Sequence, residues 1–163
     1  TILVLCTGNS ARSIMAEALF NHLGRPKIQA FSAGSHPVGL VNPFALEQIR
    51  TNLGDDGLAY RCKSWYQFSQ SQSNEPIDIV LTVCANAAHE PCPVFPGEAL
   101  QVHWAFADPA AISGSPDEIR AAFAATFFEM RTCIAPLMEL PLERMDKPQI
   151  ADALQALSKR GEQ

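Results

Sequence analysis

Hydrophobic and polar positions along the chain fall into blocks that predict strands followed by helices. The apolar run TILVLC at residues 1–6 is typical of a strand that is buried on both faces. Over residues 12–23 apolar side chains recur at helical spacing, and Gly24 ends this predicted helix. Residues 28–33 then give a second strand signal. The chain therefore begins with a strand–helix–strand unit.

The rest of the chain continues this alternation. The further predicted elements are a helix over 43–53, a short helix near 63–65, strands over 77–84 and 101–104, a long helix over 116–140 and an amphipathic terminal helix over 148–159. Asn42 and Ser115 are expected to cap two of the helices, and Pro136 is expected to bend the long one. The Pro-, Ala- and Gly-rich stretch 85–100 is predicted as an irregular loop.

Alternating strands and helices with buried-type strands predict an α/β fold with a parallel sheet covered by helices on both faces. At 163 residues the chain fits one domain, and no repeat or linker divides it. Ligands of such sheets bind beyond the carboxyl ends of the strands. Cys6 and Cys84 both end predicted strands, so we expect them at one edge of the sheet.

Composition narrows the possible partners. The net charge of −5 gives no support to a nucleic-acid partner, and an anionic substrate would need a local field from a loop or a helix end. No apolar run reaches the length of about 18 residues that spans a bilayer, and the first residues lack the basic leader of a signal peptide. Five widely spaced cysteines favour a reducing compartment, and we expect a cytoplasmic protein.

The segment between the first strand and the first helix has the composition of an oxyanion loop. It reads CTGNSARS over residues 6–13, in which Gly8 and Asn9 permit a tight turn of backbone N–H groups above a helix N-terminus. Arg12 can grip two oxygens of a tetrahedral anion, and Ser13 can donate a hydrogen bond to a thiolate. The same groups should lower the pKa of Cys6 and make it a nucleophile. The predicted oxyanion-binding residues are Thr7, Gly8, Asn9, Ser10, Ala11 and Arg12.

These motifs resemble the low-molecular-weight tyrosine phosphatases and the related arsenate reductases. The resemblance rests on CTGNSARS with the following IMAEALF, on FSAG at 31–34, on IVLTVC at 79–84 and on HWAFADPA at 103–110. It covers most of residues 1–140 and implies a single domain with a four-stranded parallel sheet flanked by helices. Residues 141–163 are then expected to form a helical extension that packs on the same domain.

The resemblance also gives Asp108 a role. An isolated Asp-Pro pair is usually a turn. In the resembling families an Asp-Pro at this place lies over the oxyanion loop and protonates the leaving oxygen, which implies that Asp108 is a general acid. His103 and Trp104 are expected to pack against this loop or orient it.

Two further cysteines favour a reductase over a phosphatase. A reductase must supply two electrons, and a pair of thiols does so by becoming a disulfide. Cys84 and Cys92 resemble the redox pair of the thioredoxin-coupled reductases, although the segment between them is one residue longer here. The resemblance implies a relay from Cys6 to Cys84 to Cys92, reset by thioredoxin or by glutathione and glutaredoxin. Arsenate is the implied substrate, with phosphate or sulfate as mimics.

Several alternatives stay open. Cys84 and Cys92 can instead be two buried free cysteines, or zinc ligands together with His89 and His103, although no CxxC knuckle is present. A protein-tyrosine phosphatase of the same fold is the second enzyme candidate, but Ala110 and the alanine after it follow Asp-Pro where phosphatases carry an aromatic residue. A non-catalytic oxyanion- or metalloid-binding module is the third possibility.

No tightly bound cofactor or metal is expected. Some resembling reductases bind potassium beside the oxyanion loop, and Asn9, Glu17 and Ser32 match that site. Trp65 stands where an aspartate is expected, which argues against potassium binding. Two cysteines, Cys62 and Cys133, receive no catalytic role.

Overall fold

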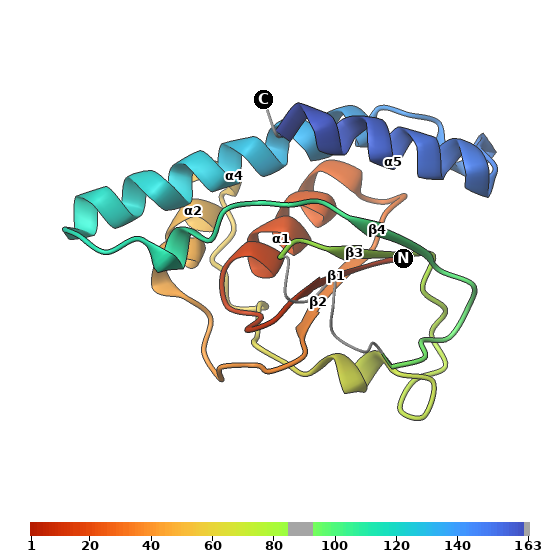
Figure 1. Cartoon of the computed structure of the whole chain (residues 1–163), viewed down its shortest axis with the longest axis horizontal. Coiled ribbons are helices and arrows are strands. Elements are labelled where there is room, and N and C mark those ends of the chain that lie inside the picture. The colour runs from red at the N-terminus through yellow and green to blue at the C-terminus, as the bar shows by residue number, and fades with distance from the viewer. Residues whose placement is uncertain (85–92, 162–163) are drawn as a thin grey trace.

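The computed structural model describes residues 1–84 and 93–161, arranged around a four-stranded parallel sheet (Figure 1). The strands are β1 (Ile2–Cys6), β2 (Ala30–Gly34), β3 (Ile79–Thr82) and β4 (Leu100–His103), in the order β2-β1-β3-β4. The α-helices are α1 (Arg12–Gly24), α2 (Pro43–Leu53), α4 (Pro116–Met138) and α5 (Lys147–Gly161). The predicted α/β fold with a four-stranded parallel sheet flanked by helices is confirmed.

Local chemistry accounts for most helix boundaries. Asn42 Oδ1 accepts the Phe44 N–H at 2.9 Å and so caps α2, as predicted. Ser115 caps α4 in the same way, while Pro136 lies in the last turn of that helix, which ends at Met138. Three short 3₁₀ helices complete the described elements: η1 (Trp65–Phe68), η2 (Pro109–Ala111) and η3 (Leu142–Arg144). The last two were not predicted, because three residues carry too little periodicity to be recognised.

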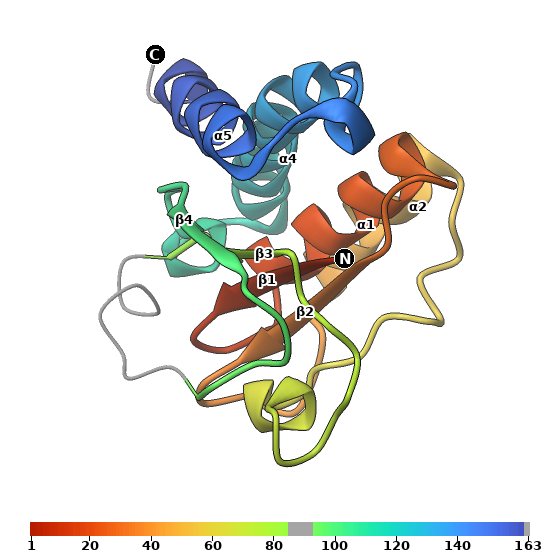
Figure 2. The same cartoon turned by 90° about the vertical axis from the view of Figure 1, so that its right-hand side faces the viewer.

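The helices are distributed unequally over the two faces of the sheet (Figure 2). Side chains alternate along β1, so that Ile2 and Val4 join a large core with α1, α4 and α5. Leu3 and Leu5 point to the other face and pack in a smaller cluster with Trp65. Among the described residues, that second face is therefore covered by η1 and loops, where long helices were expected on both faces.

The chain after residue 140 packs on the same core. Leu154 of α5 is buried, and its carbonyl oxygen accepts a hydrogen bond from Trp104 Nε1 at 2.8 Å. Helix α5 lies along α4 and beside β4 (Figure 1). The boundary between a domain over 1–140 and an extension over 141–163 stays a prediction. Within residues 1–84 and 93–161, no helix has the length and apolar character that a membrane span requires.

Candidate active site

Cys6 and Cys84 meet at the carboxyl edge of the sheet. Cys6 ends β1 and Cys84 follows β3, and these strands are direct neighbours in which Leu5 pairs with Thr82. The backbone N–H of Thr7 donates to Cys84 Sγ at 3.3 Å, and the Thr7 hydroxyl lies 3.5 Å from the same sulfur. The side chains of Cys6 and Cys84 are both buried, and Cys84 is close enough to Cys6 to shift the pKa of its thiol. The predicted meeting of the two cysteines is therefore found.

The chain after Cys6 curls into a ring whose carbonyl groups point outward. Hydrogen bonds reach these carbonyls from a neighbouring segment: His36 N–H to Thr7 O at 2.9 Å, Val38 N–H to Gly8 O at 3.1 Å and Asn42 N–H to Ser10 O at 2.8 Å. Because the two polar groups of a trans peptide point in opposite directions, the N–H groups of Gly8, Asn9 and Ala11 turn inward. A ring of inward N–H groups at the start of α1 is suited to a tetrahedral anion.

Asn9 fixes the tightest point of this ring. Its φ of 48° is left-handed, and its buried amide Nδ2 donates to Ser13 Oγ at 2.8 Å and to Ser32 Oγ at 3.0 Å. Gly34 permits the close approach of β2, since a Cβ there would lie 2.5 Å from the carbonyl oxygen of Thr7. Ser13 Oγ accepts this hydrogen bond and so supports the ring, while its hydroxyl proton is left to donate elsewhere. A hydrogen bond from Ser13 to the Cys6 thiolate stays a prediction.

Arg12 links the ring to the segment that carries Asp108. Its Nη1 donates to the carbonyl oxygen of Phe106 at 2.9 Å, and its Nη2 lies 3.6 Å from Asp108 Oδ2. Asp108 is partly exposed and also caps η2, because Oδ1 accepts the N–H of Ala110 at 3.0 Å. The structure therefore brings the Asp108 carboxylate beside the guanidinium of Arg12. Its role as a general acid stays a prediction.

The pKa of Cys6 is raised in this arrangement, not lowered. The hydrogen bond with Cys84 is the largest cause and burial is the second, while the charge of Arg12 and the N–H of Gly8 act in the opposite direction. The lowered pKa expected from the sequence is wrong here, because that reasoning counted the helix and the guanidinium but not a second sulfur. The protonation of Cys6 therefore depends on the neighbouring sulfur of Cys84 as well as on Arg12.

Of the remaining residues singled out in the sequence, His103 and Trp104 lie in the described part of the chain. Cys92 and His89 lie outside the described residues, so neither the relay nor the zinc alternative is tested in full. His103 Nδ1 lies 2.8 Å from Thr82 Oγ1, which holds the imidazole against β3. Trp104 is buried in the core. Within the described ranges, no group of three or more His, Cys, Asp or Glu side chains could hold a metal ion.

Two residues contact the ring that the sequence analysis left without a role. Cys62 Sγ donates to the carbonyl oxygen of Gly8 at 3.2 Å and accepts the N–H of Gly39 at 3.3 Å. Lys63 N–H donates to Asn9 Oδ1 at 2.8 Å. No spacing in the sequence indicates these contacts, because they depend on how residues 61–64 return across the end of β2, where Ser64 bridges to Gly34.

Comparison with known proteins assigns this chain to a family. Residues 1–146 match the family described as low molecular weight phosphotyrosine protein phosphatase. The chain belongs to this family.

Its curated relatives within the phosphatase-like family include arsenate reductases. Arsenate reductase 1 of Staphylococcus epidermidis is 36% identical over 130 residues, which cover 75% of this chain and 91% of the relative. The arsenate reductase of Bacillus subtilis is 34% identical over 117 residues, covering 72% and 79% of the two chains. The predicted resemblance to arsenate reductases of the low-molecular-weight phosphatase family is therefore confirmed.

Solved structures agree on the fold. A structure titled "An arsenate reductase in oxidized state" has a TM-score of 0.63 at 22% identity and covers 84% of this chain and 95% of that chain. A low molecular weight protein tyrosine phosphatase from T. tengcongensis has a TM-score of 0.58 at 22% identity, covering 88% and 98%. At 22% identity, these structures show that the fold is similar and say nothing more about this chain. Reductases and phosphatases of the family share that fold.

The residues that match the potassium site of some family members do not fit that ion here. Asn9, Glu17 and Ser32 do lie together, but Lys63 Nζ reaches Ser32 Oγ at 3.5 Å and Glu17 Oε2 at 4.0 Å. A cationic side chain thus lies where a bound cation would need these oxygens. Trp65, which replaces the expected aspartate, is buried on the far face of the sheet. The replacement of the expected aspartate by Trp65 is thus accompanied by the ammonium group of Lys63 beside Glu17 and Ser32.

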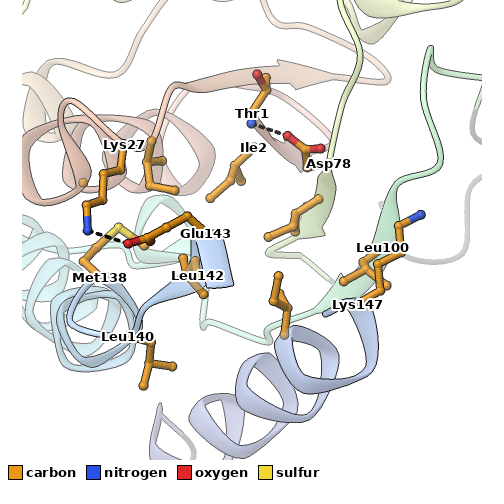
Figure 3. A pocket seen from close by; sticks show the side chains of 14 residues that line it. Thr1, Ile2, Lys27, Asp78, Leu100, Met138, Leu140, Leu142, Glu143 and Lys147 are labelled. Atoms are coloured by element: carbon orange, nitrogen blue, oxygen red, sulfur yellow. Dashed lines mark hydrogen bonds and ion pairs between the residues drawn. The ribbon is translucent and has the colours of Figure 1, made fainter. Parts of the chain in front are cut away.

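A largely apolar cavity of about 290 Å³ is lined by Thr1 and Ile2 at the start of β1 (Figure 3), whereas Cys6 ends that strand. Ile2 and Leu142 are among its apolar lining residues, and an ion pair of 3.1 Å joins Lys27 to Glu143 at its edge. Lys147, which also lines it, contacts Glu98. This cavity is therefore separate from the candidate active site and offers no unpaired charge to a ligand.

Proposed function

We propose that this protein reduces arsenate to arsenite, with Cys6 as the nucleophile and a thiol relay as the source of electrons. The observation that carries the proposal is that a second buried thiol, Cys84, lies beside Cys6 at the ring of inward N–H groups, where Thr7 N–H donates to its sulfur. A phosphatase needs one thiol at this place, whereas a two-electron reductase needs two. The similarity to curated arsenate reductases supports the same reaction.

The first step joins Cys6 to arsenic. Arsenate lies in the ring of residues 7–12 with its charge balanced by the ring N–H groups, the α1 N-terminus and Arg12. Bound arsenate accepts the proton of the Cys6 thiol, and the resulting thiolate attacks arsenic and forms a sulfur–arsenic bond. One arsenate hydroxyl leaves as water with a proton from Asp108. Arsenic keeps its oxidation state in this step.

The second step carries the two electrons. Cys84 attacks the sulfur of Cys6, a Cys6–Cys84 disulfide forms, and the electron pair of the sulfur–arsenic bond passes to arsenic. Arsenic leaves as arsenite, so two thiols have been oxidised and one arsenate has been reduced. The contact between Cys6 and Cys84 means that this attack needs little movement of Cys84.

Cys92 then returns Cys6 to its starting state. Its thiolate attacks Cys84, the disulfide becomes Cys84–Cys92, and Cys6 leaves as a thiolate. An external dithiol, thioredoxin or a glutathione–glutaredoxin system, reduces that disulfide. Such donors belong to a reducing compartment, and we propose the cytoplasm. This relay leaves no role for a bound metal or cofactor.

A donor-resolved assay tests the proposal. The purified protein is mixed with NADPH and either thioredoxin with its reductase, or glutathione with glutaredoxin and glutathione reductase. NADPH should be oxidised only after arsenate is added, and one donor should be clearly faster. An absence of turnover with both donors would refute the reductase.

The second candidate is a protein-tyrosine phosphatase, favoured by the family match itself. The ring, Arg12 and Asp108 serve both reactions equally well. Ala110 and Ala111 complete η2 after Pro109 and give no aromatic wall for a phenyl ring. Hydrolysis of a tyrosine phosphopeptide faster than arsenate reduction would establish the phosphatase instead.

A further inference from the structure

A buried carboxylate lies directly behind the oxyanion ring. The Glu17 side chain on α1 is 10% exposed, and its Oε2 accepts the Ser32 hydroxyl at 2.7 Å. Ser32 on β2 in turn accepts Asn9 Nδ2 at 3.0 Å. An unbroken chain of hydrogen bonds therefore runs from the carboxylate to the left-handed residue that shapes the ring.

The ammonium of Lys63 closes this network. Its side chain is 14% exposed, and Nζ lies 4.0 Å from Glu17 Oε2 and 3.5 Å from Ser32 Oγ. A third contact, to the carbonyl oxygen of Arg61 at 2.9 Å, holds the ammonium from the solvent side. The backbone N–H of Lys63 also donates to Asn9 Oδ1. Lys63 therefore contacts the ring through its backbone and the Glu17 carboxylate through its side chain.

A charge requirement explains why a cation is needed here. A carboxylate taken out of water is costly unless an opposite charge lies beside it. Burial is the larger effect on both groups: the pKa of Glu17 lies above its ordinary value and that of Lys63 below, while the charge of each partner opposes these shifts. Each group thus favours the charged form of the other, and Ser32 is kept as a donor to a carboxylate.

We infer that Lys63 is a built-in cation that positions the oxyanion ring through Glu17, Ser32 and Asn9, and that the protein therefore needs no dissociable monovalent cation at this place. Lys63 is a positioning residue, because it contacts the ring and not the reacting atoms. Any consequence of Lys63 for arsenate turnover rests on the proposed function. Its effect on anion binding by the ring does not.

The test uses phosphate and arsenate as probes of the ring. The dissociation constant of each anion is measured by its protection of Cys6 from iodoacetamide, read at the Cys6 peptide by mass spectrometry. In choline chloride, Lys63→Ala should bind both anions at least about tenfold more weakly than the wild type. At the same ionic strength, potassium or ammonium chloride should recover most of that loss in Lys63→Ala and change the wild type less than twofold.

Lys27→Ala is the matched control. Lys27 is exposed, pairs with Glu143 at the far end of the sheet, and should leave anion binding and its cation response unchanged. Unchanged anion binding by Lys63→Ala in choline chloride would overturn the inference. A loss that potassium, ammonium and choline affect equally would overturn it as well, because that result describes a structural side chain without a cation role.

A double substitution guards against misfolding of the single variant. Lys63→Met keeps the aliphatic stem and should weaken anion binding without recovery by potassium, since its stem fills the space. Adding Glu17→Gln removes the uncompensated carboxylate and should restore part of the binding if charge pairing is the role of Lys63. A double variant that binds no better than Lys63→Met would contradict this role. If the variants bind anions as expected but the wild type does not reduce arsenate, the proposed function is refuted and the role of Lys63 stands.

Discussion

The backbone N–H of Thr7 donates to the sulfur of Cys84 at 3.3 Å, although 77 positions separate the two residues in the chain. This hydrogen bond ties the segment after β3 to the first peptide of the oxyanion ring. It also holds the Cys84 sulfur beside the Cys6 sulfur. The geometry of the ring and the approach of the second sulfur therefore depend on one another.

Replacement of Cys84 should separate the two halves of the proposed reaction. We predict that Cys84→Ser lowers the rate of arsenate reduction by about 10³-fold or more, equivalent to ~4 kcal/mol of activation free energy, since no second thiol can release arsenite. Any weak hydrolysis of p-nitrophenyl phosphate should persist, because that reaction needs no second thiol. Cys133→Ala removes a buried thiol of α4 and serves as the control. Equal loss of both activities in Cys84→Ser would refute the relay.

The coupling of the two sulfurs should also appear in the titration of Cys6. The hydrogen bond with Cys84 is the largest cause that raises the pKa of Cys6, so Cys84→Ala should lower this pKa. A lower pKa means more thiolate at pH 7, and iodoacetamide should alkylate Cys6 faster than in the wild type. Arg12→Gln should shift the pKa upward, because the guanidinium charge favours the thiolate. The measurement is the pH dependence of alkylation at the Cys6 peptide; an unchanged midpoint in Cys84→Ala would contradict the coupling.

Asp108 can be tested by an isosteric change. Asp108→Asn keeps an oxygen that accepts the Ala110 N–H but has no acidic proton, so η2 should stay folded. If Asp108 is the general acid, the kcat for arsenate should fall by about 10²-fold or more with a much smaller change in KM. Asp117→Asn, on the exposed first turn of α4, is the control. A kcat within twofold of the wild type would remove Asp108 from the mechanism.

Strand and helix signals predicted the sheet and the ring well, because both rest on local sequence. The apolar run that ends in Cys6, the Gly-Asn turn and Arg12 at the start of α1 all lie within twelve residues of one another. A parallel sheet also forces the ends of neighbouring strands to one edge, which is why Cys84 could be placed beside Cys6. The local sequence pattern and the sheet topology together were sufficient to predict where Cys6, Arg12 and Cys84 lie.

Contacts from distant loops could not be predicted in the same way. The raised pKa of Cys6 depends on a contact between two sulfurs, and the sequence places them at one edge without fixing their separation. Lys63 received no role from the sequence, because its contact with Glu17 depends on a segment with no regular periodicity. The sparse cover of the second sheet face has the same origin, because η1 and the loops around it carry weak signals.

The C-terminal extension offers a test of whether the chain is one folding unit. We propose that residues 141–163 unfold together with the domain, because Leu154 is 1% exposed and its carbonyl accepts the indole N–H of Trp104. Leu154→Ala should lower the free energy of unfolding by about 2–5 kcal/mol through loss of buried contacts and the cavity left behind. Trp104→Phe should also destabilise the protein, since it removes that hydrogen bond and part of the core.

Urea unfolding followed by far-ultraviolet circular dichroism and by tryptophan fluorescence checks this prediction. The two signals should coincide in the wild type and shift together to lower urea in Leu154→Ala, as a single cooperative unit requires. Gln155→Ala changes an exposed neighbour on the same helix and should leave the midpoint nearly unchanged. If α5 instead unfolded in an earlier, separate transition, Leu154→Ala would move that transition alone. The extension would then be an appendage, and the large core beneath α4 would have to be stable without it.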